Sequence, residues 1–399
     1  MTGRGKAAAL FRFLVMATVS VLLLSCGSKL QQPLSQLDTT EHYTFTGVRL
    51  LDQEKFSAAG REFELALRLD PRYSRAHAGA GLVKAYQGDF KGAFESLKQA
   101  EKNAGSDEEK LFVLVGYIRV NTISHAACLS IGTSCRPDDA WVKYSQDAFA
   151  QAVRIDPKAA SPYYFMGECY LTALDLDQAG RLFSMVLDMN GEHVGDADRR
   201  WKQVQKIQRA RPGTVTGIKI ALVERITRAD AAALFMEELK IDTLYTRRTP
   251  RGFDTAFRDA ERVRTAAPRP VAATDIADHP LRADIEGILR IGTRGLDVYP
   301  DGAFRPDEQV DRASYAMMIE DFLSRITGDE ALATRFIGSP SPFPDLRADL
   351  PYFNAVMVVT SRGIMEAKDM VTGEFAPLQP VGGAEALLVI RKIREQLRY

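Results

Sequence analysis

Small and large apolar residues alternate with a 34-residue period between Tyr43 and Phe183. Antiparallel helices cross closely only where the side chains are small, and large side chains fill the groove to the next hairpin. The pattern therefore predicts a row of stacked helical hairpins. Three registers carry it: Gly47, Phe56, Ala59, Phe63, Ala66 and Pro71; Gly81, Phe90, Ala93, Leu97 and Ala100; and Tyr163, Gly167, Tyr170, Leu176, Ala179 and Phe183.

Helix boundaries in this region follow from local chemistry. Asp70-Pro71 and Asp156-Pro157 are predicted to end two helices, because a proline ring cannot continue the hydrogen-bond ladder. Phe149, Ala152 and Pro157 fit the second helix of a further hairpin, and the apolar run from Leu111 fits its first helix. Residues 196–211 combine an apolar stripe with a polar side that is rich in Arg and Lys. This pattern predicts a helix that caps the end of the repeat, with its polar side in solvent.

These units resemble tetratricopeptide repeats. The resemblance implies an α-solenoid over residues 41–211, with a concave groove that holds an extended peptide or a helix of an unidentified partner protein. The alternative is that the groove binds nothing specific and the repeat only spaces its neighbours.

The sequence changes after Pro212-Gly213, where a second kind of repeat begins. Its copies resemble S-layer homology modules over residues 215–260, 273–326 and 341–396, within a domain of residues 212–399. The signature of the first module is Ile226 to Leu234. The second module has Asp275-Ile276, Val298 to Pro306 and Val310 to Ser314. The third has Phe343-Pro344-Asp345, Gly373 to Pro377 and Val381 to Glu385. The resemblance implies a largely helical three-module domain that binds cell-wall polymer in grooves between modules. The whole chain is predicted to be mainly α.

Most of this signature has a structural explanation. Pro300-Asp301-Gly302 predicts a tight turn with a positive φ at the glycine. Phe304 and Phe375 are expected to plug a small core. Thr227 with Asp230 is predicted to form a capping box, and Asp311 to cap the helix of the second module. By the resemblance these three residues are also expected to belong to the site that binds the wall polymer.

Arg228 and Arg312 are predicted to lie in the first turn of a helix, where the helix macrodipole disfavours a cation. A cation at these two positions therefore needs an explanation other than helix stability. The resemblance implies that each arginine points into a groove and holds an anionic group of the polymer, for which a guanidinium fork is well suited. The alternative is a solvated surface arginine. On the binding hypothesis, replacing both by Ala should weaken wall binding and leave folding intact.

Two departures from the family pattern stand out. The third module has Gly383 where the arginine is expected, which suggests an inactive groove or a different ligand. The first module contains a long Arg- and Pro-rich insertion, from Arg247 to Pro270.

Residues 1–25 match a secretory signal peptide: Arg4, Lys6 and Arg12 precede an uncharged apolar run too short to span a bilayer. Leu23-Leu24-Ser25-Cys26 resembles the lipobox of bacterial lipoproteins, which implies a lipidated Cys26. The absence of Asp at position 27 then indicates the periplasmic face of the outer membrane, with residues 26–40 as a polar tether. The alternative is an ordinary signal peptide with a chance cysteine.

Export to an oxidising compartment favours a disulfide between Cys128 and Cys135. Free thiols are the alternative, and a zinc site is disfavoured because His125 is the only nearby histidine. Cys169 lies in an apolar helical pattern and is expected to be a core thiol.

Lys+Arg and Asp+Glu both number 52, so the chain lacks the positive charge of a nucleic-acid binder. No phosphate loop, nucleophile elbow or metal-ligand motif is present, so no catalytic residue, cofactor or metal is predicted.

We expect a non-catalytic envelope lipoprotein that tethers the outer membrane to wall polymer or peptidoglycan, with the helical repeat as a protein-binding spacer. The first alternative is a periplasmic scaffold lipoprotein that acts mainly through protein binding in the repeat groove. A wall-modifying enzyme is the second, which the missing motifs disfavour.

Overall fold

The computed structural model describes residues 39–131, 140–248 and 273–397. Within these ranges the chain forms helices joined by loops and contains no β-strand, which confirms a mainly α fold. The packing of the described residues divides into two compact units: those up to residue 173 with 188–193, and residues 174–187 with those from 194 onward.

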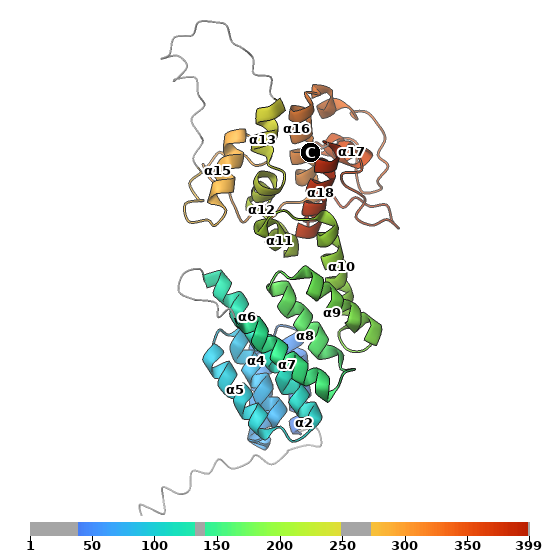
Figure 1. Cartoon of the computed structure of the whole chain (residues 1–399). Coiled ribbons are helices and arrows are strands. Elements are labelled where there is room, and N and C mark those ends of the chain that lie inside the picture. Colours follow the sequence, from blue (N-terminus) through green and yellow to red (C-terminus); the bar gives the residue numbers. More distant parts are fainter. Residues whose placement is uncertain (1–38, 132–139, 249–272, 398–399) are drawn as a thin grey trace, which may run out of the picture. The chain divides into compact units, whose positions relative to one another are not determined.

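The first unit consists of helical hairpins that follow one another along the chain, blue to green in Figure 1. Each helix packs on the next, and the first helices α4, α6 and α8 also pack on one another. This successive pairing is the arrangement that the 34-residue pattern predicts. The helices are α2 (Thr40–Asp52), α3 (Phe56–Leu69), α4 (Ser74–Tyr86), α5 (Phe90–Asn103), α6 (Asp107–Ile131), α7 (Trp141–Ile155) and α8 (Ala160–Thr172).

Phe63 shows why small residues are needed where these helices cross. Its ring is fully buried, between Gly47 on α2 and Gly79 on α4. A Cβ atom would lie 2.7 Å from this ring if built on Gly47, and 2.2 Å from it if built on Gly79. Both distances are shorter than van der Waals contact, so the two glycines allow the helices to close around the aromatic ring.

α6 is the most apolar long helix in the described part of the chain. By length and composition alone it is the one described helix that could cross a membrane. It packs against α4, α5, α7 and α8, so it is covered on several sides. These contacts bury 39% of its most apolar window.

Several predicted helix limits are confirmed. α3 and α7 end at Leu69 and Ile155, directly before the two Asp-Pro pairs. The predicted capping helix is α10 (Val194–Ala210). α10 and most of the preceding α9 (Leu176–Met189) group with the C-terminal unit, because α10 packs on the last helix of the chain.

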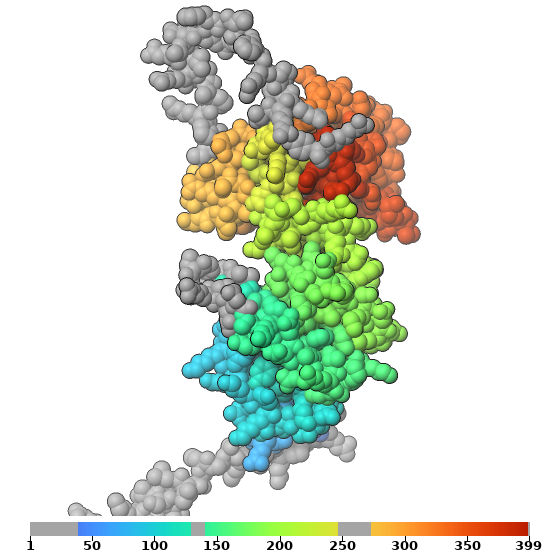
Figure 2. Space-filling model, viewed as in Figure 1, coloured from blue at the N-terminus to red at the C-terminus, as the bar shows by residue number. Residues whose placement is uncertain are grey.

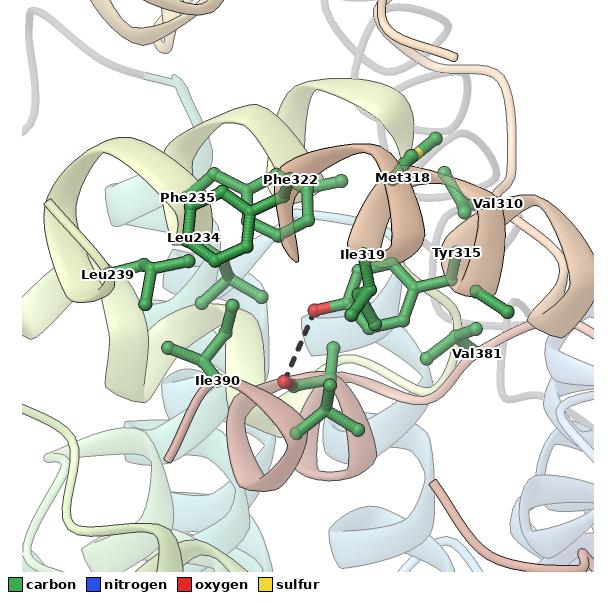
Figure 3. Packing of buried hydrophobic residues seen from close by; sticks show 14 of the residues in the cluster. Leu234, Phe235, Leu239, Val310, Tyr315, Met318, Ile319, Phe322, Val381 and Ile390 are labelled. Atoms are coloured by element: carbon green, nitrogen blue, oxygen red, sulfur yellow. Dashed lines mark hydrogen bonds between the residues drawn. The ribbon is translucent and has the colours of Figure 1, made fainter. Parts of the chain in front are cut away.

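The second unit contains a continuous apolar core. Figure 3 shows Phe235 and Tyr315 within it, and the Tyr315 hydroxyl donates a hydrogen bond to the Ala386 carbonyl at 3.2 Å. The further helices are α11 (Val215–Leu222), α12 (Arg228–Ala233), the π-helical η1 (Leu234–Glu238), α13 (Ile241–Arg248), α15 (Arg282–Ile291), α16 (Arg312–Thr327), the 3₁₀ turn η2 (Glu330–Thr334), α17 (Phe353–Ser361) and α18 (Gly383–Gln396).

A closed ring of three backbone hydrogen bonds joins the segments that precede α12, α16 and α18. Ile226 N–H donates to the Val381 carbonyl at 2.9 Å, and Val381 N–H donates to the Val310 carbonyl at 2.9 Å. The Val310 N–H completes the ring by donating to the Ile226 carbonyl at 3.0 Å. The three repeated signatures therefore meet around one pseudo-threefold axis.

The structural roles predicted for the signature are confirmed. Thr227 and Asp230 form the capping box of α12, and the Asp311 side chain accepts from Ser314 N–H at the start of α16. Phe304 and Phe375 are fully buried. Gly302 has a φ of 83°, as its turn requires.

Candidate functional site

Arg228 and Arg312 begin α12 and α16, and neither is a solvated surface residue. They are 7% and 1% exposed. Each guanidinium enters the loop of the following module and lies over its plugging aromatic ring, Arg228 at 4.7 Å from the centroid of Phe304 and Arg312 at 4.4 Å from that of Phe375. The alternative of a solvated surface arginine is therefore wrong for both.

Backbone carbonyl oxygens occupy most donors of Arg228. Its Nε donates to Phe304 O at 2.8 Å, its Nη1 to Gly295 O at 2.7 Å and its Nη2 to Asp297 O at 2.7 Å. The Arg228 side chain therefore holds the backbone of this loop in place. This role explains a cation at the start of a helix, where the macrodipole alone would disfavour it.

Arg312 repeats this arrangement one module further along. Its Nε donates to Phe375 O at 2.8 Å and its Nη2 to Glu366 O at 2.6 Å, while its Nη1 forms an ion pair with Glu385. Burial lowers the pKa of Arg312 to about 10, which still leaves the guanidinium protonated at neutral pH.

These contacts disagree with the expectation that Ala at both positions would leave folding intact. Removing either side chain would leave several carbonyl oxygens without a donor, and removing Arg312 would also leave Glu385 without its buried partner. Unpaired buried polar groups destabilise a fold. Any loss of binding in such variants therefore has to be separated from unfolding.

Gly383 takes the corresponding position at the start of α18. A Cβ atom there would lie 1.7 Å from the Ile220 carbonyl oxygen of α11. The Gly383 N–H donates to the Val223 carbonyl at 3.0 Å. No side chain fits at this position, because α11 fills the space that a loop occupies in the other two modules.

A pocket of about 390 Å³ adjoins Arg312. It lies between α10, α18 and the segment after α17; α10 and α18, green and red in Figure 2, pack directly on each other. Five cationic and two acidic side chains line it: Lys206, Arg209, Arg312, Lys368 and Lys392, with Glu366 and Glu385. We call it the cationic pocket.

The two carboxylates already have partners. Glu385 pairs with Arg312 and, at 3.0 Å, with Lys368, while Glu366 pairs with Lys392 at 2.6 Å. Lys206 forms no hydrogen bond or ion pair with any described residue, and Arg209 donates only to the Gln205 carbonyl of its own helix, at 3.4 Å. The pocket therefore keeps positive charge that no described carboxylate neutralises by contact.

The pKa values follow this excess of positive charge. Burial lowers the pKa of Lys206, and Arg209 and Arg312 lower it further, against the attraction of Glu366. Burial likewise lowers the pKa of Lys368, with Arg312 and Lys206 adding to the effect. An anion in the pocket would relieve this repulsion and accept charge-assisted hydrogen bonds from the ammonium groups.

A second pocket, of about 310 Å³, adjoins Arg228 and has a different charge. Its charged lining consists of Arg228, Asp297 and Glu308. The Tyr299 hydroxyl donates to Glu308 at 3.0 Å, and the Arg228 guanidinium lies 4.9 Å from the centroid of the Tyr299 ring. This pocket offers an anion little attraction.

The predicted site residues thus separate into two groups. Arg312 lines the cationic pocket and Arg228 the other one, whereas Thr227, Asp230 and Asp311 act as helix caps. The sequence did not point to Lys206, Arg209, Lys368 and Lys392. The three-residue spacing of Lys206 and Arg209 places them on one helix face, but only the packing of α10 on α18 shows that this face borders Arg312.

Among the cysteines, Cys169 is free and buried, as predicted. Cys128 is disulfide-bonded. Cys135 and the lipidation candidate Cys26 lie outside the described residues, so the pairing of Cys128 with Cys135 stays a prediction. Within the described ranges no group of three or more His, Cys, Asp or Glu side chains could hold a metal ion.

No protein-family model matches this chain, and no curated protein matches it either.

Proposed function

We propose that this chain is a lipid-anchored envelope protein that binds an anionic cell-wall polymer in the cationic pocket and so tethers a membrane to the wall. The observation that carries the proposal is the pocket itself, where five cations surround a space with two carboxylates that are already paired. A carboxylate or phosphate group of the polymer would occupy the space next to Lys206.

The resemblance of the repeated signature to S-layer homology modules supports the choice of a wall polymer. The pocket adjoins Arg312, the position that the resemblance assigns to ligand binding. Arg312 itself acts as a positioning residue, because its donors are used by Phe375 O, Glu366 O and Glu385. Lys206 and Arg209, with Lys368 and Lys392 beside them, would contact the anion.

Co-sedimentation with isolated sacculi tests this proposal. The chain without its predicted signal peptide and lipidation site, residues 27–399, is compared with a variant that also carries Lys206→Gln and Arg209→Gln. We expect this variant to bind at least about tenfold more weakly, since two charge-assisted contacts of about 1.5 kcal/mol each could account for more than that. Chemical removal of the attached polymer from the sacculi should abolish binding of the parent chain.

The matched control carries Arg199→Gln and Lys202→Gln. These residues lie on the same helix, and each is ion-paired to an acid of its own helix and exposed. The control removes the same charge and should bind like the parent. Equal loss in both variants would show nonspecific attraction, and no loss in either would remove the pocket from the binding reaction.

The membrane anchor depends on Cys26 and is tested separately. Cells that express the full chain would be labelled with a radioactive fatty acid. Labelling should be present in the natural chain and absent with Cys26→Ser. Labelling that persists in the variant would contradict lipidation at this position.

The second candidate function is that of a periplasmic scaffold that binds a protein through the helical hairpins. A separate cavity among these hairpins favours it, and its chemistry is developed below.

A further inference from the structure

The first unit contains a cavity of about 570 Å³, within the size range of about 300–1,000 Å³ that is typical of ligand sites. α6 supplies one side of it, and the second helices α5 and α7 supply the others. No lining residue comes from α4 or α8, so the cavity is not part of the face that the first helices α4, α6 and α8 build together. We call it the α5–α7 cavity.

Its charged lining is acidic. Glu101 on α5 and Asp147 on α7 border the cavity, and no Lys or Arg is among its described lining residues. The Tyr117 hydroxyl donates a hydrogen bond to Glu101 at 2.9 Å and so orients this carboxylate. Burial and this contact together raise the pKa of Tyr117. The phenol therefore stays a neutral donor.

Aromatic rings form another part of the lining. Trp141 stacks on His125 with ring centroids 4.1 Å apart and an angle of 12° between the planes. Tyr144, three residues further on α7 and so on the same face, is 54% exposed. An exposed aromatic ring beside carboxylates is a surface on which a flat cation can stack.

Asn121 adds an unused polar group. It lines the cavity from α6, is 9% exposed, and its side-chain amide has no hydrogen-bond partner among the described residues. Its amide atoms are not among the buried side-chain atoms that lack a partner, so they are open to a ligand or to water in the cavity. Its carbonyl oxygen can accept a hydrogen bond from a ligand donor.

We propose that the α5–α7 cavity binds an arginine side chain presented by a partner protein. A guanidinium is planar, stacks on aromatic rings and carries five N–H donors. Those donors match two carboxylates and one amide oxygen, and the charge matches the acidic lining. The proposal rests on the protein-binding role suggested for the hairpins, and it does not involve the cationic pocket.

The fluorescence of Trp141, which lines the cavity, reports on binding. The chain contains two tryptophans, so Trp201→Phe leaves Trp141 as the only one. The full chain with this substitution, under non-reducing conditions, is titrated with acetyl-Leu-Arg-Leu-amide while tryptophan fluorescence is followed. We expect a saturable change. The citrulline analogue, which has the same shape without the charge, should bind at least tenfold more weakly.

Free L-arginine should also bind at least tenfold more weakly than the peptide, because it lacks the flanking leucine side chains and the backbone amides of a presented arginine. The double variant Glu101→Gln/Asp147→Asn should lose at least tenfold in affinity for the peptide. Glu95→Gln, also on α5 but outside the cavity lining, is the matched control and should not.

Equal binding of the citrulline peptide, tighter binding of free arginine, or an unchanged affinity in the double variant would each overturn the proposal. A saturable response to N-acetylglucosamine in place of the arginine peptide would overturn it as well. Sedimentation with sacculi should be unaffected by the double variant, so failure here is distinguishable from failure of wall binding.

Discussion

The pockets beside Arg228 and Arg312 are related by the internal repeat, yet they differ in charge. In both, a buried arginine donates through Nε to the carbonyl of a buried phenylalanine, at 2.8 Å in each case. Asp275 and Asp345 also play the same part, since each carboxylate accepts two backbone N–H groups around that phenylalanine. Only the Arg312 pocket, however, is lined by four further cations.

This difference shows that the repeated signature forms the pocket, whereas residues outside the signature determine the charge of the ligand that the pocket can bind. Lys206 and Arg209 come from α10, which precedes the first module, and Lys392 comes from the third turn of α18. The pocket beside Arg228 has Glu308 and Asp297 instead. The same arginine-centred packing thus supports one cationic and one acidic surface.

The third position extends the comparison. Where α11 replaces the long loop, the arginine is replaced by Gly383. The two changes belong together, because an arginine at this position would have no loop carbonyls to bind and no space. The absence of an arginine at this position thus has a specific geometric basis, while an inactive groove or a different ligand stays a prediction.

The largest effect is expected from Arg312→Met. This change removes two hydrogen bonds to carbonyl oxygens and leaves the mostly buried Glu385 with Lys368 as its ion-pair partner. We expect a loss of about 4 kcal/mol in the free energy of unfolding of the second unit. Urea unfolding followed by circular dichroism measures it. A loss below about 1 kcal/mol would contradict the structural role of this arginine.

Arg228→Met should cost less, about 3 kcal/mol, since no buried carboxylate loses its partner. Three carbonyl oxygens lose a donor, two of them only partly buried and so open to water. The same urea experiment applies. A larger loss than for Arg312→Met would reverse the ranking of the two arginines.

Gly383→Ala is expected to destabilise by about 2 kcal/mol, because the new methyl group collides with the Ile220 carbonyl and α11 has to shift. Gly195→Ala on α10 is a suitable control, since no atom lies within 4 Å of a Cβ at that position. Unfolding midpoints of the two variants would be compared. Equal midpoints would show that α11 moves freely.

The smallest expected effect, a change of a few-fold, is a pH dependence of wall binding. A group with a lowered pKa keeps its charge below that pKa and loses it as pH rises through it. Burial and nearby cations lower the pKa of Lys206 and Lys368, so binding should weaken above neutral pH, earlier than for ordinary lysines. Sedimentation with sacculi between pH 7 and 10 measures this.

Lys206→Arg tests whether Lys206 is the group that titrates, because a guanidinium keeps its charge over the whole range from pH 7 to 10. We expect the variant to bind at neutral pH and to retain more of its binding at high pH than the parent. An identical pH profile in the two chains would show that Lys206 is not the titrating group.

Local features were predictable from the sequence because they depend on near neighbours in the chain. The 34-residue pattern predicted the hairpins, the Asp-Pro pairs predicted the ends of α3 and α7, and Thr227 with Asp230 predicted the capping box of α12. The tight turn at Gly302 and the free, buried Cys169 follow in the same way. The caps, turns and helix ends depend on chain geometry within one or two helical turns, and the hairpins depend on contacts between helices that are adjacent in the chain.

The charge and the boundaries of the candidate site required the tertiary structure. From the sequence, the Arg- and Lys-rich face of α10 was predicted to be the solvated side of a capping helix. Its packing on α18 instead places Lys206 and Arg209 beside Arg312. The burial of Arg228 and Arg312 was equally hidden, because their partners are carbonyl oxygens more than 50 residues away that carry no side-chain signal. The sequence determined the helices and their caps, and long-range packing decided which charges face a common pocket.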